Sequence, residues 1–419
     1  QGYSSAASDV YKRQVWDKWT RIALVKRILV GLILGAILGI AVPQATGIAI
    51  LGDVFVSALK AIAPLLVFFL VISSLCNAGK SHGGVIKTVI ILYVFSTVLA
   101  AVIAVFASMA FPVKMTLANA ATDTSAPQGI VEVLNNLLLN VVANPVSSLV
   151  NANYVGILMW AVLLGLAFRV ADKMTKKVLA DVADGISMVV TWIINLAPFG
   201  IFGLVFNTVS TNGLDIFTTY GKLLLLLVGC MLFIYFVTNP LLVYWCIRQN
   251  PYPLIFHCLK RSALTAFFTR SSAANIPVNM KVCEEMGLDR DTYSVTIPLG
   301  ATINMDGAAI TITVMTMATA FTLGIHVDIP TAIILSLLAA LSACGASGVA
   351  GGSLLLIPMA CSLFGISDDI SMQVVAVGFI IGVVQDSVET ALNSSSDLLL
   401  SASAEFRQWR LEGKEIKFK

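Results

Sequence analysis

The sequence predicts an all-α integral membrane protein, and its composition and its hydrophobic runs both support this. Of its 419 residues, 58% are hydrophobic and 12% are charged, whereas a soluble domain has about 25% charged residues. Runs of about 20 apolar residues recur along the chain, long enough to cross a hydrocarbon layer of roughly 30 Å. The seven cysteines lie singly without a CxxC spacing, which disfavours a metal cluster or a redox pair.

The first part of the chain predicts six ordinary membrane spans and one long polar loop. Residues 1–17 contain no apolar stretch like that of a signal peptide, and we expect them to be a disordered or non-native segment. The loop is expected over Pro112–Asn153. The spans, bounded by charges, proline or glycine, are Ile22–Val42, Ile48–Cys76, Val85–Phe111, Tyr154–Val170, Ile186–Asn207 and Leu223–Ile247.

Basic residues alternate between the connections of these spans. They gather before the first span, at Lys80 and Lys87, in the segment from Arg169 to Lys177, and at the C-terminus. The opposite loops hold Lys114 and Lys222. Because cytoplasmic loops of membrane proteins are enriched in lysine and arginine, we expect both termini in the cytoplasm.

The chain from about Tyr252 onward has apolar segments that are interrupted by polar residues. Residues 269–277 (TRSSAANIP) and residues 345–352 (GASGVAGG) each lie between two apolar arms that are too short to span alone. Each pair of arms predicts a re-entrant hairpin with a polar tip, since irregular backbone at membrane depth is tolerated where protein or a water-filled cavity covers it. Two interrupted segments in corresponding positions indicate the binding site of a transporter.

Polar residues also interrupt two helices in this part. One helix is broken at residues 304–307 (NMDG), between the hairpins. The last helix, expected at about Met372–Ser401, carries polar residues at positions i, i+3, i+4, i+7 and i+11, which fall within about 100° of arc. These are Asp386, Glu389, Thr390, Asn393 and Asp397. Ionisable groups at this depth are costly, so the stripe predicts a wet cavity with cationic partners.

The residue types indicate what this cavity holds. Asn304, Asp306, Asn393 and Asp397 offer hard oxygen ligands of the kind that bind sodium or protons in transporters. The helix N-termini at the serine-rich tips favour a carboxylate, and Asp386 favours an ammonium. A carboxylate and an ammonium at short spacing describe an amino acid. We expect a co-transported cation, Na⁺ or a proton, but no organic cofactor and no nucleic-acid partner.

Three other interpretations remain open. Residues 345–348 (GASG) match the GxSG pattern of intramembrane serine proteases, but the histidines His82, His257 and His326 lie outside the later spanning helices, and such a serine needs a base within reach. A channel would conduct without stoichiometric coupling. A proton-coupled carrier differs from a sodium-coupled one only in its ion.

At these residues the chain resembles the dicarboxylate/amino acid:cation symporter family, and within it the bacterial sodium:serine/threonine symporters. The resemblance covers nearly everything after Asp17 and is most specific at residues 269–277, 297–307 and 386–397. It implies eight transmembrane helices, two re-entrant helical hairpins, an elevator-type transporter fold and a homotrimer in the bacterial inner membrane. Residues 18–251 would form mainly the scaffold, with helices 3 and 6 joining the transport domain. Residues 252–405 would form the core of that domain, and residues 406–419 a cytoplasmic tail.

The resemblance also implies site residues. Asp386 would hold the substrate ammonium with the Arg270 and Val349 carbonyls, and Ser272 and Asn393 would hold the carboxylate. The whole expected substrate set is Arg270, Ser271, Ser272, Val349, Asp386, Glu389, Thr390 and Asn393. One sodium ion is expected at Asp397, Asn393, Asn304 and the Gly300 carbonyl, a second at carbonyls of the second tip, and a third at Asp306, Asn304, Tyr93, Ser96 and Thr97. That tip is expected to be the extracellular gate, and its glycines supply hinge freedom. The expected gate residues are Gly345, Ser347, Gly348, Gly351 and Gly352.

The chain departs from the family pattern at three positions. Members that carry acidic substrates have an arginine in place of Glu389 and a threonine in place of Ala308, and the proline common in the second tip is Ala350 here. The first two departures favour a small neutral substrate, serine or threonine. A proton-coupled carrier or an acidic amino acid carrier of the same family stays as the alternative.

Overall fold

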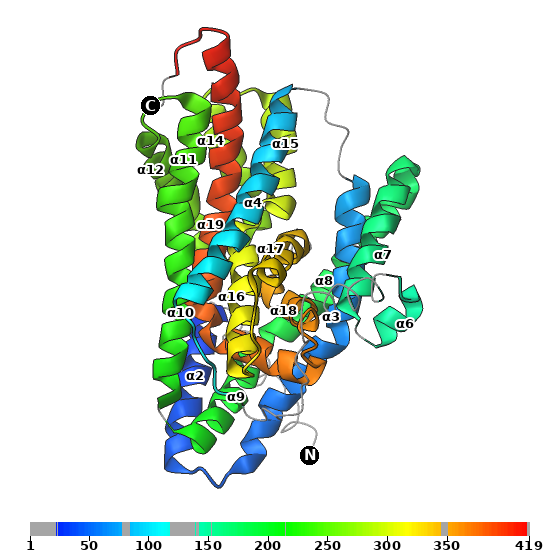
Figure 1. Ribbon diagram of the computed structural model, residues 1–419, viewed down its shortest axis with the longest axis vertical. Helices are drawn as coiled ribbons and strands as arrows, with labels where there is room; N and C mark the ends of the chain where they lie inside the picture. Colours follow the sequence, from blue (N-terminus) through cyan, green and yellow to red (C-terminus); the bar gives the residue numbers. More distant parts are fainter. Residues whose placement is uncertain are drawn as a thin grey trace, which may run out of the picture.

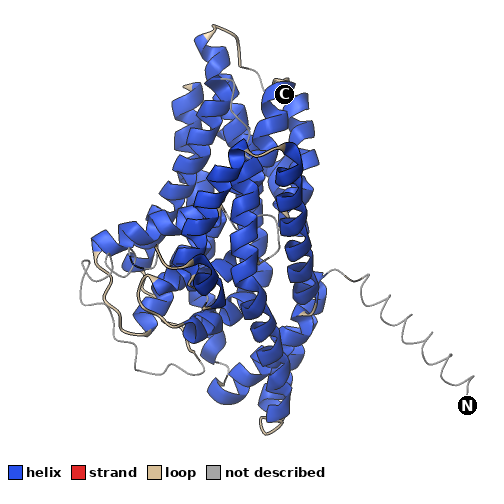
Figure 2. Cartoon of the chain, turned by 90° about the vertical axis from the view of Figure 1, so that its right-hand side faces the viewer, coloured by secondary structure: helices blue, strands red, loops and turns tan. Residues whose placement is uncertain are grey.

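The computed structural model describes residues 22, 24–77, 84–117, 139, 142–151, 153–213, 215–344 and 351–416. Within these ranges the chain forms helices joined by loops, without a strand (Figure 2). The all-α prediction is therefore confirmed for the described part. Six helical stretches in it are long and apolar enough to cross a membrane: Thr46–Asn77, Gly84–Ala110, Lys173–Asn195, Phe217–Ile247, Arg290–Thr322 and Asp368–Leu411. The number of eight spans stays a prediction.

The helices of the first part pack against one another along the bottom and the right-hand side of the view in Figure 1. Close approach of α2 to α9 depends on glycine, because a Cβ added at Gly31 would lie 2.2 Å from the Pro198 carbonyl oxygen. The elements are α2 (Leu24–Ala41), η1 (Thr46–Ala49), α3 (Ile50–Asn77), α6 (Pro145–Val150), α7 (Tyr154–Ala167), η2 (Phe168–Val170), α8 (Lys173–Asn195) and α9 (Ala197–Asn212).

The predicted fifth span, Ile186–Asn207, is wrong in its bounds. The structure has α8 before Leu196 and α9 after it, with Pro198 in the first turn of α9. The start of α8 was missed because its first turns are rich in charge. Asp172 caps that end by accepting a hydrogen bond of 2.7 Å from the Thr175 backbone N–H, as helix N-caps do. This bond holds the pKa of the Asp172 carboxyl below its usual value.

Two long helices connect the first part to the hairpins. The first is α4 (Gly84–Ala110), which packs against α16 and α17. The second is α10 (Asp215–Phe233), which continues through the π-helical turn η3 (Ile234–Thr238) into α11 (Asn239–Ile247). The predicted span Val85–Phe111 is confirmed as helical by α4, and the predicted span Leu223–Ile247 is confirmed as helical by α10, η3 and α11.

The structure has a helical hairpin at the first predicted position, and its tip lies where the polar residues predict it, while its re-entrant path in the membrane stays a prediction. One arm consists of α12 (Tyr252–Cys258), η4 (Leu259–Ala263) and α13 (Leu264–Thr269), and the other is α14 (Ser272–Glu285). The chain turns at Arg270, whose φ of 52° lies in the left-handed region that non-glycine residues rarely adopt. For the second hairpin the structure describes α17 (Ile329–Ala343), η5 (Gly352–Leu356) and α18 (Ile357–Ser362).

Between the hairpins lies the predicted broken helix, with α15 (Arg290–Ile303) and α16 (Asp306–Thr322) separated by Asn304 and Met305. The last helix, α19 (Asp368–Leu411), begins earlier and ends later than the predicted Met372–Ser401. It packs against α13, α14, α15 and α16, and also against α4, α10 and α11 (Figure 1). This central position explains why α19 can carry a polar stripe, since protein rather than lipid covers it.

Candidate substrate and cation site

The predicted polar stripe of α19 is buried inside the helical assembly. Exposed fractions are 3% for Asp386, 5% for Glu389, 6% for Thr390, 4% for Asn393 and 1% for Asp397. Helices rarely bury three carboxyl groups on one face, because each needs charged or hydrogen-bonding partners. The partners come from both hairpins and from the broken helix, so segments far apart in the sequence meet at this face.

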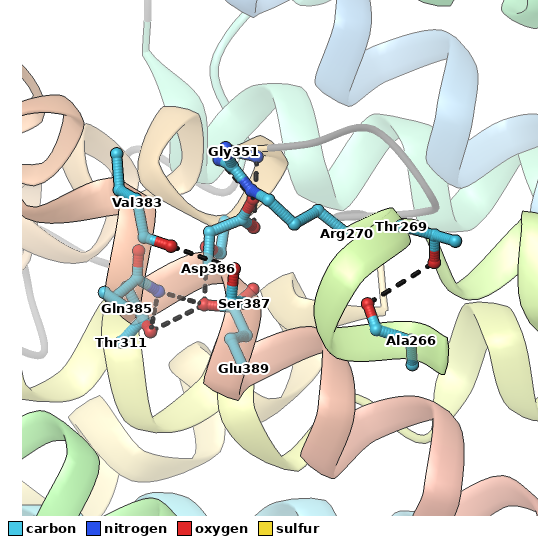
Figure 3. A network of polar contacts seen from close by, with 11 residues as sticks. Ala266, Thr269, Arg270, Thr311, Gly351, Val383, Gln385, Asp386, Ser387 and Glu389 are labelled. Carbon is cyan, nitrogen blue, oxygen red and sulfur yellow. Dashed lines mark hydrogen bonds and ion pairs between the residues drawn. The ribbon is translucent and has the colours of Figure 1, made fainter. Parts of the chain in front are cut away.

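Asp386 is held between the two hairpins. The Arg270 Nε and one terminal guanidinium nitrogen each lie 2.6 Å from Asp386 Oδ2, and the Gly351 backbone N–H donates to Asp386 Oδ1 at 3.2 Å. Figure 3 shows the Arg270 side chain reaching from the tip of the first hairpin to Asp386. The sequence interpretation gave Arg270 a role through its carbonyl, and it did not anticipate this ion pair.

The local geometry of the first tip places Arg270 for this contact. The helix α13 ends as the Arg270 N–H donates to the Ala266 carbonyl. The next helix begins at once, with the Ser271 hydroxyl as N-cap accepting from the Ala274 N–H at 3.2 Å. Ser272 is the first residue of α14 and is 5% exposed. The N–H groups of such a helix start are suited to a carboxylate.

Glu389 lies one turn after Asp386 and is surrounded by neutral donors. Its Oε2 accepts from the Thr311 hydroxyl at 2.7 Å, from the Ser353 hydroxyl at 2.9 Å and from the Gln385 amide. Figure 3 shows Thr311, Gln385 and Glu389 in this network. The sequence interpretation missed Thr311, Ser353 and Gln385. Gln385 could have been predicted from the sequence, because a residue four positions before Glu389 lies on the same face of a helix.

Asn393 and Asp397 join α19 to the broken helix. The Asn393 Oδ1 accepts from the Gly307 N–H at 2.7 Å, and the Asn304 amide donates to Asp397 Oδ1 at 2.9 Å. The other polar atom of Asn304, its Oδ1, is buried without a hydrogen-bond partner. An unpaired buried acceptor beside a carboxylate is the kind of oxygen that a cation would coordinate.

Two expected cation ligands, Tyr93 and Gly300, lie beside Asp397. The Tyr93 hydroxyl contacts the Ser401 hydroxyl at 2.7 Å and donates to the Asp397 carbonyl at 2.9 Å. A Cβ added at Gly300 would lie 2.8 Å from the Tyr93 hydroxyl and from Asp397 side-chain atoms, so this approach requires glycine. Tyr93 was expected to share a sodium ion with Asp306, and that role stays a prediction; the structure shows its hydroxyl donating to the Asp397 backbone carbonyl.

Asp306 forms a separate polar cluster with α4. Its two carboxylate oxygens accept from the Ser96 hydroxyl at 2.7 Å and from the Thr97 hydroxyl at 3.2 Å. The Met305 N–H donates to the Thr97 hydroxyl at 3.2 Å. All three side chains are buried. The structure thus brings together three of the residues expected to hold one sodium ion: Ser96, Thr97 and Asp306.

Part of the expected site falls outside the described residues. These positions are Gly345, Ser347, Gly348 and Val349 of the second tip. The remaining expected gate residues, Gly351 and Gly352, are buried at the start of η5, and Gly351 has a φ of 73°. A Cβ there would meet the Phe379 ring at 3.0 Å, so both backbone conformation and space call for glycine at this position.

Comparison with known proteins identifies the family to which a chain with this arrangement belongs. The model of the sodium:dicarboxylate symporter family matches residues 24–405, which include both hairpins, the broken helix and the α19 stripe. The chain belongs to the sodium:dicarboxylate symporter family. The resemblance drawn from the sequence motifs is thereby confirmed.

Curated relatives within this symporter family cover nearly the whole chain. The "Serine/threonine transporter SstT" of Bifidobacterium adolescentis is 58% identical over 405 residues, which are 96% of this chain and 94% of that protein. The protein of the same name from Streptococcus thermophilus is 56% identical over 393 residues, which are 94% of this chain and 98% of that protein. These relatives are named as transporters, and the family is one of symporters, so the protease interpretation of the GASG segment is not supported.

Proposed function

We propose that this chain is a sodium-coupled symporter that imports serine and threonine. The observation that carries the proposal is the pair of buried carboxyl groups one turn apart on α19, each with a different kind of partner. Asp386 faces a cation, and Glu389 faces hydroxyl and amide donors. The names of the curated relatives agree with this substrate class.

The two carboxyl groups fit the two ends of a hydroxy amino acid. Asp386 would hold the substrate ammonium at the position that the guanidinium takes here, while Ser272 and Asn393 would hold the carboxylate. Glu389 already accepts from the Thr311 and Ser353 hydroxyls, and a serine or threonine hydroxyl is a donor of the same chemistry. A second substrate carboxylate would meet Glu389 as a like charge, which disfavours aspartate and glutamate.

Sodium ions are proposed as the coupling ions at two clusters of oxygen ligands. One is Asp397 with Asn304 and the Gly300 carbonyl, where the unpaired Asn304 Oδ1 supports a cation. The other is Asp306 with Ser96 and Thr97. Carboxylates, hydroxyls and free carbonyls are hard oxygen donors, and transporters with broken helices use such groups for sodium.

The cellular setting follows from charge and from the family. We propose a homotrimer in the inner membrane of a bacterium, with both termini in the cytoplasm, because the basic connections fall on one side. Residues 252–405 with helices α4 and α10 would move as a transport domain against a scaffold of the remaining helices. The packing of α4 and α10 on α16 and α19 supports assigning them to the moving part.

The test is uptake into proteoliposomes that contain the purified chain. Radiolabelled serine and threonine should accumulate under an inward sodium gradient, aspartate and glutamate should not, and choline in place of sodium should abolish uptake. Proton-driven uptake of equal rate would replace the sodium proposal with the proton-coupled alternative. Uptake of aspartate at the rate of serine would instead favour an acidic amino acid carrier.

A further inference from the structure

The charges around the site leave Asp386 with one cationic partner in the described part of the chain. Glu389, Asp397 and Asp306 take hydrogen bonds from neutral hydroxyl and amide groups, whereas Asp386 is ion-paired with Arg270. The Arg270 side chain is 10% exposed and that of Asp386 is 5% exposed. This is a buried ion pair, and a carboxylate that loses such a partner becomes an unpaired buried charge.

The Arg270 guanidinium also occupies the position at Asp386 where a substrate ammonium is proposed to bind. Two of its nitrogens contact the same oxygen, Asp386 Oδ2, at 2.6 Å, while Oδ1 is taken by the Gly351 N–H. Both oxygens of Asp386 are therefore engaged by groups of the protein itself. A substrate ammonium can reach Oδ2 only if the guanidinium withdraws, so the two cations compete for one oxygen.

We propose that the Arg270 side chain is the internal counter-ion that lets the empty carrier return. This inference rests on the proposed function, in which Asp386 binds the substrate ammonium. During import the substrate supplies the positive charge opposite Asp386. After release Arg270 takes that place, so the empty site crosses the apolar layer with Asp386 neutralised. Without Arg270 the empty site would carry an unpaired carboxylate, which slows this step because ionised groups at membrane depth are costly.

Comparing net uptake with exchange distinguishes the return of the empty carrier from substrate binding. Net uptake into serine-free vesicles needs the empty carrier to return in every cycle. Exchange of external labelled serine for internal serine, with equal sodium on both sides, lets the carrier cross loaded in both directions. We expect Arg270→Gln to lower the ratio of net uptake to exchange at least tenfold, with both rates measured at saturating serine so that a change in affinity does not enter the comparison.

Two matched variants guard the interpretation. Arg270→Lys keeps a cation at the tip and should keep the ratio of net uptake to exchange within threefold of the parent. Arg261→Gln removes a cation from the same hairpin, where Arg261 pairs with Glu285 at the exposed end, and should leave both rates unchanged. Retained exchange in Arg270→Gln also reports that the variant is folded and inserted.

Three results would overturn the inference while leaving the proposed function intact. The first is an unchanged ratio in Arg270→Gln. The second is an equal loss of both processes in that variant, which would make Arg270 a substrate contact or a fold determinant. The third is a lysine variant that fails to restore the ratio, since shape rather than charge would then matter. A parent chain that shows neither uptake nor exchange of serine or threonine would overturn the proposed function itself.

Discussion

Asp386→Asn tests the assignment of the ammonium site most directly. The substitution keeps the shape of the side chain and removes its charge, so the guanidinium of Arg270 and the substrate ammonium both lose their partner. The Gly351 N–H can still donate to the asparagine carbonyl at the position of Oδ1. We therefore expect an inserted and folded variant whose change lies in substrate affinity.

The magnitude follows from the ion pair seen in the structure. Breaking a buried ion pair by removing one partner costs about 3–5 kcal/mol. In the parent, however, the ammonium must first displace Arg270, and that lost pair offsets part of the gain. Taking roughly half of the cost as the net loss, about 1.5–2.5 kcal/mol, we expect serine to bind roughly 10- to 60-fold more weakly.

By the same reasoning, the loss of serine affinity caused by Asp386→Asn depends on whether Arg270 is present. In Arg270→Gln no guanidinium competes for Asp386, so adding Asp386→Asn should cost the full amount, about 150-fold or more in affinity. Equilibrium binding of radiolabelled serine to the four purified proteins, at saturating sodium, completes this double-mutant cycle. Equal penalties in both backgrounds would show that Arg270 and the ammonium do not compete. Affinity of Asp386→Asn within threefold of the parent would place the ammonium elsewhere.

Three further predictions concern specificity, the cation and stability. Glu389→Arg should weaken serine uptake at least tenfold and admit labelled aspartate, since a guanidinium pairs with a second carboxylate; Glu389→Ala with unchanged selectivity would contradict this. Asp397→Asn should raise the sodium concentration for half-maximal serine uptake at least fivefold, because the oxygen beside Asn304 loses its charge. Asn279→Leu should lower stability by about 1–3 kcal/mol, seen as a lower melting temperature, because the Ser262 hydroxyl loses its acceptor.

The parts of the fold that the sequence predicted are those with a local signal. The first hairpin follows from a polar segment between apolar arms, and the break at Asn304 from polar residues inside an apolar run. The α19 stripe follows from helical periodicity alone. The break at Leu196 was missed, although Pro198 marks it. The charged first turns of α8 were assigned to a loop, so the end of α8 and the whole of α9 were combined into one predicted span.

The partners within the site could not be predicted in the same way. Arg270 and Asp386 are 116 positions apart, and Ser353 and Glu389 belong to different elements. Such pairings depend on how helices pack, which periodicity does not encode. Tyr93 illustrates the limit, since no pattern in the sequence indicated that its hydroxyl would donate to the Asp397 backbone carbonyl.

In the proposed function, the different surroundings of Asp386 and Glu389 would give each carboxyl group one task. A guanidinium and an ammonium are both cations, so in the proposed function the substrate would replace Arg270 at Asp386 without leaving this carboxylate unpaired. Glu389 has hydroxyl partners from α16 and from η5, beside the second tip, so a substrate hydroxyl would join donors of its own kind. An alanine side chain would offer no donor to this acid, and a site built around a hydroxyl discriminates against substrates that lack one. We therefore propose that two residues one helical turn apart set selectivity and charge balance.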